Sequence, residues 1–477
     1  MIYKNFKDKH PEKVDLNEFS RIHREIPDEI KKGFTALKGT TEEYSYMASP
    51  ACFSELEGDT RLSSLKFDNS LASIRLWSML LSEEQRLHKS RKAGKRIIGA
   101  MKDLGTIPVI AYAHPEIISF YPDGAWWIPC VMEMNAGLLK IADGAGLGEE
   151  YCPARVALSA FLNRAHFPMP ELLIGAVGSC CDDFSAVMSR ISRTDMKVSW
   201  WELPYRRETD SKINTTELST GIRVENHLID FVEEQFKTII QEIKNHLGLE
   251  ITDEMLTESI KNANRLRKSL ANIRDMAYGI TPAPLPSLEA QICEMFALHY
   301  CSDMEEGIDV IEFVEQMVID RVENNIGILP EDNAKILWVN PVADLRIMNI
   351  FEDLGGRVAG SEYLFSHSLT QIPEDTHPTK ALAMIALCDP MIGSSRYRAK
   401  LICDEIEKYD SEGVLISDIP GASHCATEGH IIKEEVQKRF DIPVLNITIP
   451  PLADSSLGQL STRISAFIEI IKARREK

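Results

Sequence analysis

Several features that would assign a function at once are missing from this sequence. No segment matches G-x-x-x-x-G-K-[ST], the loop that holds nucleotide phosphates, so the chain offers no P-loop of its own. No apolar stretch approaches the roughly 20 residues that a membrane-spanning helix needs. The first residues, Met1 to Asp8, contain no apolar region typical of a secretory signal. We therefore expect a cytoplasmic protein with no membrane partner.

Basic charge is scarce as well. Lys and Arg number 53 against 72 Asp and Glu, which gives a formal net charge of -19 at pH 7. Nucleic acid and anionic membranes repel such a surface, so neither is expected as the main partner. A disulfide framework is not expected either, because the ten cysteines lack the spacing of a small secreted scaffold. Most of them should be buried as small hydrophobic side chains, which leaves a minority for metal.

The order of apolar runs predicts an α/β fold. From about residue 95, short apolar runs such as Thr106–Ala111 and Leu172–Val177 alternate with helical patterns, which implies parallel sheets with right-handed crossovers. A long helical stretch separates two such units. We predict two doubly wound parallel-sheet lobes around a cleft, joined by a helical region. The predicted divisions are a helical N-terminal arm (1–94), a first α/β lobe (95–210), a helical connecting region (211–332) and a second α/β lobe (333–477).

Two adjacent thiols, Cys180 and Cys181, follow the apolar run Leu172–Val177, at the edge where α/β sheets build their sites. Gly178 and Ser179 lie between the apolar run and the thiols, and we expect their backbone N–H groups to be free to hydrogen-bond sulfur. Adjacent side chains point different ways, so one thiol is expected to bind metal while the other packs. Cys181 is favoured because Asp182 follows it, and Cys180 is the alternative. Burial of both thiols in the core is the simpler interpretation.

Two further cysteines occupy comparable positions. Cys152 precedes Pro153, a residue suited to the first position of a helix, where the helix dipole favours a thiolate. Cys425 lies in the small-residue loop Gly421–Gly429, after the predicted strand Val414–Ile416. An ordinary helix start and an ordinary strand-to-helix connection are the alternatives. If all three positions face one cleft, Cys152, Cys181 and Cys425 can share one iron–sulfur cluster.

The other candidates carry weaker signals. His424 and Glu428 lie near Cys425 and are candidate proton carriers. The segment Gly393–Arg398 opens a helix and could hold a phosphate or carboxylate, although a plain helix cap is favoured. Core packing is predicted for Cys293, Cys301 and Cys403. Cys130 and Cys388 are the candidate ligands of a second cubane.

Taken in order, these segments resemble the 2-hydroxyacyl-CoA dehydratase and benzoyl-CoA reductase family. The likeness extends from about residue 95 onward. It rests on the order and spacing of several phrases: Tyr151–Leu158 at the first cysteine, Pro168–Leu173 before the thiol pair, Glu412–Ile416 before Cys425, and the ending Leu460–Glu469.

The resemblance implies a subunit that holds a [4Fe–4S] cluster through three cysteines, here Cys152, Cys181 and Cys425, with one iron left open for chemistry. It implies a related second subunit in a heterodimer or hetero-oligomer, an acyl-CoA substrate and a separate ATP-dependent iron–sulfur activator. In the dehydratases, one electron converts the thioester carbonyl to a ketyl radical, the 3-hydrogen becomes acidic and the 2-hydroxyl group leaves. Three alternatives stay open: a benzoyl-CoA-type reductase subunit, a double-cubane electron-transfer or reductase protein, and a cofactor-free two-lobed binding protein with buried thiols.

Overall fold

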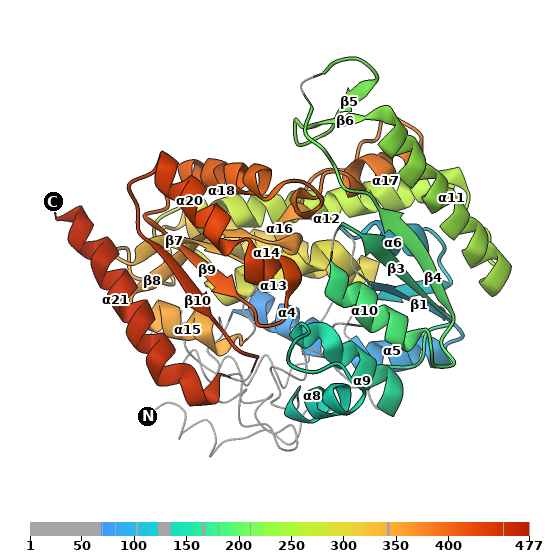
Figure 1. Cartoon of the computed structure of the whole chain (residues 1–477), viewed down its shortest axis with the longest axis horizontal. Helices are drawn as coiled ribbons and strands as arrows, with labels where there is room; N and C mark the ends of the chain where they lie inside the picture. Colours follow the sequence, from blue (N-terminus) through green and yellow to red (C-terminus); the bar gives the residue numbers. More distant parts are fainter. Residues whose placement is uncertain are drawn as a thin grey trace.

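The computed structural model describes residues 68, 70–81, 83–101, 104–122, 135–164, 167–179, 181–209, 211–340, 344–451 and 453–476. These residues form two four-stranded parallel sheets that lie side by side, one in each half of Figure 1. Long helices pack between and across them, and α12 (Asp253–Gly279) contacts elements of both lobes. The predicted class, two parallel-sheet lobes with helices, is confirmed.

The first sheet has the strand order β2-β1-β3-β4, with every neighbouring pair parallel. From β1, the sheet is extended on one side by β2 and on the other side by β3 and β4. The topological switch point, where open α/β sheets bind ligands, therefore lies between β1 and β3. Its elements are β1 (Arg96–Met101), α6 (Thr106–Tyr112), β2 (Ile117–Phe120), α8 (Asn135–Gly144), η1 (Pro153–Arg155), α9 (Val156–Asn163), β3 (Leu172–Gly178), α10 (Asp182–Ile191) and β4 (Val198–Leu203).

The second sheet repeats this topology. Its order is β10-β9-β7-β8, which reads β8-β7-β9-β10 from the other edge. In both sheets the strands therefore stand in the order second, first, third, fourth along the chain. The strand equivalent to β3 is therefore β9, and these are the strands that precede Cys181 and Cys425. The elements are β7 (Ala334–Val339), α15 (Arg346–Asp353), β8 (Gly356–Glu362), α16 (Leu364–His367), α17 (Pro378–Ala386), η3 (Pro390–Ile392), α18 (Ser395–Tyr409), β9 (Gly413–Asp418), α19 (Ser423–Thr427), α20 (Gly429–Arg439), β10 (Val444–Thr448), η4 (Asp454–Ser456) and α21 (Leu457–Arg475).

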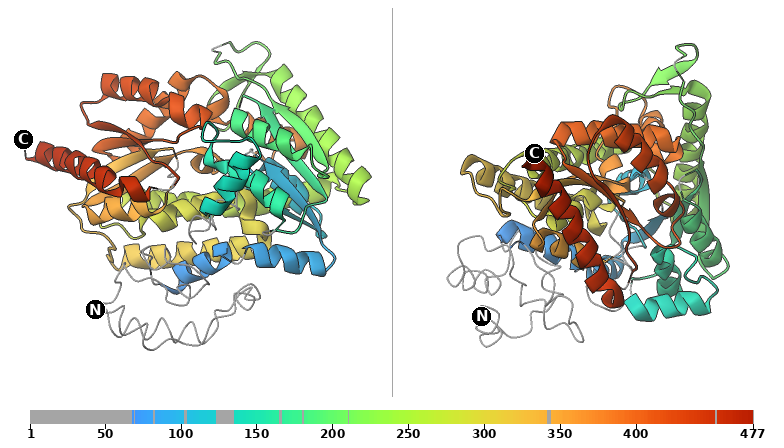
Figure 2. Two further views of the ribbon diagram at one scale, coloured as in Figure 1. Left: turned by 60° about the horizontal axis from the view of Figure 1, so that its bottom comes forward. Right: turned by 60° about the vertical axis from the view of Figure 1, so that its left-hand side comes forward.

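Helices precede the first sheet and connect the two sheets. Figure 2 shows the early helices lying along the long connecting helices, and α4 packs against α14. The predicted arm is helical where it is described, and residues 1–67 lie outside the described residues. No described helix combines the length and the apolar character needed to cross a membrane. These elements are α4 (Leu71–Leu81), α5 (Glu83–Lys92), the hairpin of β5 (Thr215–Glu217) and β6 (Arg223–Glu225), α11 (Asn226–Leu247), α12, α13 (Ser287–His299), η2 (Tyr300–Ser302) and α14 (Met304–Glu323).

The prediction of a strand at Thr106–Ala111 is wrong, because this apolar run forms helix α6. All six of its residues are buried, and a run buried on every side has no polar face to reveal its period. The strand lies earlier, at Arg96–Met101. Gly105 separates the two with a left-handed backbone, φ 79°, and a Cβ there would lie 2.6 Å from the carbonyl oxygen of Ala297.

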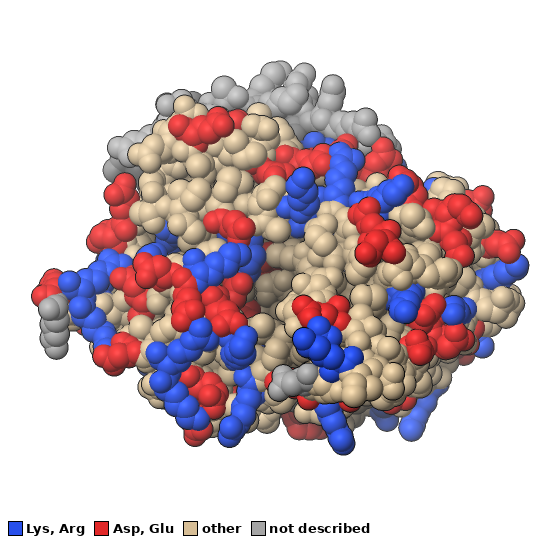
Figure 3. Space-filling model, turned by 90° about the horizontal axis from the view of Figure 1, so that it is seen from above, with Lys and Arg blue, Asp and Glu red and all other residues tan. Residues whose placement is uncertain are grey.

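One continuous apolar core joins the two lobes. Ile98 and Ile174 of the first sheet belong to the same buried cluster as Ile336 and Leu415 of the second. Buried apolar surface thus fixes the two sheets against each other. On the face seen in Figure 3, the surface is hollowed between the two halves, and acidic and basic side chains are intermixed.

A polar bridge reinforces this contact just beyond β4. Arg206 is completely buried, and its guanidinium donates from Nη1 to the carbonyl oxygen of Asp389 at 3.1 Å. Its backbone N–H donates to the carbonyl oxygen of Ile392 at 2.8 Å, and its guanidinium lies 5.0 Å from the ring centroid of Tyr397. The chain leaving the first sheet is therefore anchored on the second lobe.

A buried acid makes the stability of this fold pH-dependent. Glu289 on α13 accepts hydrogen bonds from the backbone N–H of Asp68 at 2.7 Å and from Nε1 of Trp77 at 3.1 Å. Burial raises its pKa to about 8, with Asp68 adding to the rise. Between pH 4.5 and 8 the folded state therefore keeps a proton that the unfolded state has lost. This group's contribution falls as pH rises through that window, by on the order of 3 kcal/mol at pH 7.

We accordingly expect Glu289→Gln to flatten the decline of the unfolding free energy between pH 5 and pH 8. Urea unfolding at several pH values measures it, because the amide has the shape of the protonated acid and does not titrate. The exposed Glu258 on the neighbouring helix provides the control, since Glu258→Gln should leave the slope unchanged. An unaltered slope in the Glu289 variant would show that this carboxyl is ionised in the folded protein.

Candidate functional site

The structure places two of the predicted cysteines at helix starts. Cys152 is the residue that caps η1, with Pro153 in the first turn as predicted. Cys181 caps α10 with an extended backbone, φ -168°. Cys425 lies inside the short helix α19 (Ser423–Thr427), so the prediction of a loop there is wrong. The helix forms because backbone bonds such as Ala426 N–H to the carbonyl oxygen of Ala422, 2.8 Å, close its single turn.

These three thiols are close enough to interact electrostatically. Burial raises the pKa of the Cys152 thiol well above its usual value, and the thiols of Cys181 and Cys425 raise it further. A hydrogen bond with the backbone of Ala154 acts in the opposite direction. The structure therefore gathers at one place three cysteines that are far apart in the sequence, two from the first lobe and one from the second. Cys180 lies outside the described residues.

Gly421 brings the second lobe directly onto the first beside these thiols. It has φ 78°, and a Cβ there would lie 2.5 Å from both the carbonyl carbon and the carbonyl oxygen of Tyr151. Only glycine meets both requirements, the left-handed backbone and the close approach. Tyr151 immediately precedes Cys152, and Gly421 lies one turn before Cys425, so this contact sets the distance between the two halves of the site.

Asp183, in the first turn of α10, connects the two cysteines of the first lobe. Its Oδ1 accepts from the backbone N–H of Cys152 at 3.3 Å, and its Oδ2 lies 4.0 Å from Sγ of Cys181. The carboxylate is well placed at the positive end of the helix. The sequence-based choice of Cys181 relied on the adjacent Asp182, but it is Asp183 that contacts Cys152 and Cys181.

The expectation of free N–H groups before the thiol pair is wrong for Ser179. Its backbone N–H donates to the carbonyl oxygen of Leu203 at 3.0 Å. Gly178 has φ 101°, and a Cβ at this position would lie 2.5 Å from the same oxygen. The end of β3 is thus held tightly against the end of β4, and this N–H is not available to a sulfur atom.

A buried ionic network lies behind Cys425, and no strong pattern in the sequence predicts it. Its centre is Arg398 on α18, which is fully buried and donates to both carboxylate oxygens of Glu362 and to Glu428. In the sequence, only the helix start predicted at Gly393–Arg398 points to this region. Ser394 does cap this helix by accepting from the N–H of Tyr397 at 3.2 Å, as the plain interpretation predicted. The inward direction of Arg398 is a tertiary feature.

Opposite charges in this network shift the pKa values of Glu362 and His367 toward their charged forms. Burial alone would raise the pKa of Glu362, but Arg398 and His367 together lower it to about 2. Burial alone would lower the pKa of His367, but Glu362 and Asp389 raise it above its usual value. Oε1 of Glu362 lies 2.7 Å from Nε2 of His367, whose Nδ1 lies 3.3 Å from Asp389. A fixed set of opposite charges therefore lies behind the third cysteine.

The two predicted proton carriers have different surroundings. Glu428 is held by Nη1 of Arg398 at 2.6 Å and by the hydroxyl of Ser395 at 2.8 Å, and its side chain is 12% exposed. His424 precedes Cys425 in α19 and is half-buried. Proton transfer by either residue stays a prediction.

The remaining described cysteines lie in the core. The predicted packing of Cys293, Cys301 and Cys403 is confirmed, since all three are buried. Cys388 is 3% exposed, and burial raises its pKa, which hydrogen bonds with Thr220 lower. Cys130 lies outside the described residues.

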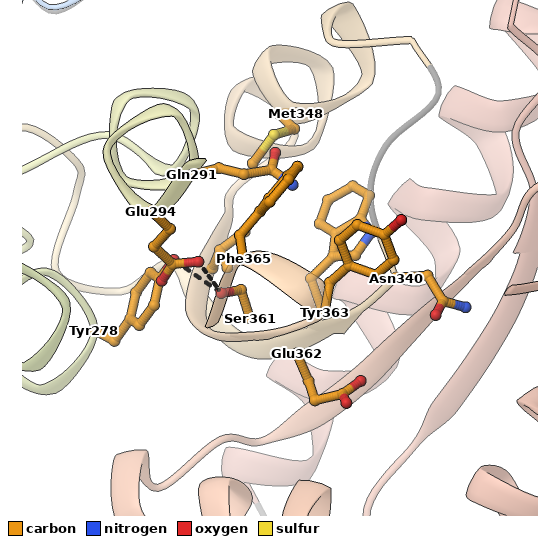
Figure 4. Close-up of a pocket in the computed structure, with 11 residues that line it drawn as sticks. Tyr278, Gln291, Glu294, Asn340, Met348, Ser361, Glu362, Tyr363 and Phe365 are labelled. Atoms are coloured by element: carbon orange, nitrogen blue, oxygen red, sulfur yellow. Dashed lines mark hydrogen bonds between the residues drawn. The ribbon is translucent and has the colours of Figure 1, made fainter. Parts of the chain in front are cut away.

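A narrow pocket opens beside this network, at the carboxyl end of the second sheet. Its cavity volume is about 10 Å³, roughly the room that one water molecule needs. Figure 4 shows Glu294 held by Ser361, whose hydroxyl donates to Oε2 at 2.8 Å, and by Tyr278. Glu362 and Asn340 line the pocket but direct their polar ends away from its aromatic wall. The pocket lining consists of Tyr278, Gln291, Glu294, Trp338, Asn340, Met348, Val358, Ser361, Glu362, Tyr363 and Phe365.

Within the described part of the chain, no three His, Cys, Asp or Glu side chains converge closely enough to hold a single metal ion. Thiolates of an iron–sulfur cluster bind different iron atoms, so they surround a larger volume than the ligands of one ion do. The three cysteines lie near one another, with Cys152 and Cys181 partly buried and Cys425 buried, and this arrangement is compatible with a cluster. Their chemistry also fits, because soft thiolates are the ligands that iron–sulfur clusters take.

Fold and site together define a two-lobed α/β protein with thiols from both lobes gathered between them. Comparison with known proteins gives the family. Residues 111–471 match the family model of the 2-hydroxyglutaryl-CoA dehydratase, D-component, and the chain belongs to this family. It is also 25% identical over 235 residues to "Putative dehydratase subunit YjiM" of Escherichia coli (strain K12), an alignment that covers 48% of this chain and 60% of that protein. The resemblance seen in the sequence is thereby confirmed.

Proposed function

We propose that this chain is an iron–sulfur subunit of a radical 2-hydroxyacyl-CoA dehydratase, with Cys152, Cys181 and Cys425 holding a [4Fe–4S] cluster. The observation that carries the proposal is the gathering of three thiols from two lobes, each at or near the start of a helix that follows a strand or a crossover. Family membership supports the same class of enzyme.

The electrostatics of the site favour metal over simple packing as the reason for this arrangement. Cys152 is surrounded by two other sulfur atoms and by Asp183, all of which raise the pKa of its thiol beyond the rise that burial causes. Like-charged neighbours bring no benefit to a core thiol. A bound metal reverses this cost, because it stabilises the thiolate form of each ligand.

Three protein thiolates leave one iron of the cluster open, and an open position is what substrate chemistry requires. When bound, the cluster would supply one electron to the thioester carbonyl of the acyl-CoA, so that the 3-hydrogen becomes acidic and the 2-hydroxyl group can leave. The chain's own residues exclude water and accept protons. His424 is the stronger candidate acceptor of the 3-hydrogen, because the carboxylate of Glu428 is already committed to Arg398 and Ser395.

The partners follow from the same assignment. A component of this family works with a further component, for which we propose a related subunit in a heterodimer or hetero-oligomer. Because the sequence has no P-loop, we propose that a separate ATP-dependent iron–sulfur activator injects the electron. The exposure of such a cluster to oxygen would be damaging, which favours an anaerobic cytoplasm.

Metal analysis of the anaerobically purified protein tests the proposal. We expect about four iron and about four sulfide per chain, with the broad visible absorbance of a cubane. A colourless protein without iron would overturn it and favour a cofactor-free binding protein. About eight iron per chain would instead support a double-cubane protein. Counting electrons per turnover then separates a dehydratase, which recycles its electron, from a benzoyl-CoA-type reductase, which consumes electrons with each product.

A further inference from the structure

The guanidinium of Arg398 is held in a single orientation by the groups around it. Nε donates to Oε1 of Glu362 at 2.9 Å and Nη2 donates to Oε2 of the same carboxylate at 2.7 Å, which is a two-pronged pairing. Nη1 donates to Glu428 at 2.6 Å. The side chain is 0% exposed, so the cost of burying its charge has to be offset by these fixed partners.

Asn340 links Arg398 to Cys425 by hydrogen bonds. Its Oδ1 accepts from Nη2 of Arg398 at 2.8 Å, which fixes which way the amide faces. The amide nitrogen then donates to the carbonyl oxygen of Ser417 at 2.9 Å and to that of Cys425 at 3.3 Å. Asn340 itself has a left-handed backbone, φ 67°, at the end of β7. Its backbone N–H donates to the carbonyl oxygen of Glu362 at 3.0 Å, so this one residue ties together the ends of β7, β8 and β9 and helix α19.

We propose that Arg398 is a positioning residue for the Cys425 corner of the cluster: through Asn340 it fixes the turn that carries this cysteine. This inference rests on the proposed function, because it presupposes a cluster at the three thiols.

The charge of Arg398 is balanced by the carboxylates of Glu362 and Glu428. Its effect on the Cys425 segment is therefore exerted through the position of Asn340.

The test is the EPR signal and the iron content of the cluster in the full-length protein. Arg398→Met should change the EPR line shape and reduce iron retention, because Asn340 loses the donor that fixes its amide. Arg398→Lys keeps the charge but loses the two-pronged pairing, so its EPR signal should stay closer to wild type. Asn340→Ala removes the link to Cys425 with Arg398 intact, so it should reproduce the change seen in Arg398→Met. The exposed Arg439, on α20 of the same lobe, provides the control Arg439→Met, which should change neither.

Loss of Arg398 alone would leave two buried carboxylates without their partner, so the triple variant Arg398→Met, Glu362→Gln, Glu428→Gln, which has no ionised side chain at these three positions, is included to preserve folding. An unchanged EPR signal in either Arg398→Met protein at full iron content would overturn the inference while leaving the proposed function standing. A wild-type protein without iron would overturn the proposed function, and this inference with it.

Discussion

Replacing Cys152, Cys181 or Cys425 by alanine, one at a time, is expected to reduce the bound iron at least roughly tenfold, because each change removes one of three thiolates that share a single cluster. The three variants should behave alike even though Cys425 belongs to the other lobe. Iron and sulfide analysis after anaerobic purification measures this, together with the loss of visible absorbance. Unfolding curves of the apo-proteins show whether the fold is retained.

Two other cysteines serve as matched controls. Cys403 is a buried thiol in the outer core of the second lobe, and Cys403→Ala should keep the wild-type iron content. Cys180→Ala decides between the two adjacent thiols, since Cys181 is the proposed ligand. Full iron in all three ligand variants would show that the assignment is wrong, and loss of iron with Cys180→Ala but not with Cys181→Ala would exchange their roles.

The second large effect concerns Gly421. We expect Gly421→Ala to destabilise the protein and to lower its iron content, because the added methyl group would meet the Tyr151 carbonyl and force the two lobes apart beside Cys152. The steric part should cost roughly 1–3 kcal/mol of unfolding free energy beyond the strain of a left-handed alanine. Urea unfolding and metal analysis of the same preparation measure both effects.

Gly221, in the turn between β5 and β6, is a close control. It has the same φ of 78°, but a Cβ there would have no heavy atom within 4 Å. Gly221→Ala therefore carries the backbone strain without the contact, and its iron content should stay at the wild-type value. Equal iron loss in both variants would mean that backbone strain, rather than the approach of the lobes, accounts for the effect.

The repeated strand order explains how the site is divided between the lobes. Cys181 and Cys425 follow β3 and β9, the strands that occupy the same place in their sheets. Parallel strands present their carboxyl ends at one edge, so two equivalent edges that face each other supply ligands from opposite sides. Cys152 is the additional contribution of the first lobe, from the crossover before β3.

Prediction from sequence succeeded where the signal was local. Pro153 after Cys152 indicated a helix start, and the apolar run before Gly178 indicated a buried strand. It failed at Thr106–Ala111, where complete burial hides the difference between strand and helix, and at Ser179, whose N–H is taken by a strand 24 positions later in the chain. The sequence around Arg398 predicted only a helix cap. Whether an arginine at a helix start is buried or exposed depends on what packs against the helix, which the local sequence does not reveal.

The sequence by itself determined the α/β class, the candidate cysteines and the family, since these depend on the order of residue types along the chain. Only the tertiary structure decided that thiols from two lobes meet, that Gly421 sets their spacing against Tyr151, and that Asn340 links Arg398 to Cys425. These features depend on which carboxyl-end segments face each other. That choice is made by the apolar core that joins the sheets, through contacts between residues hundreds of positions apart.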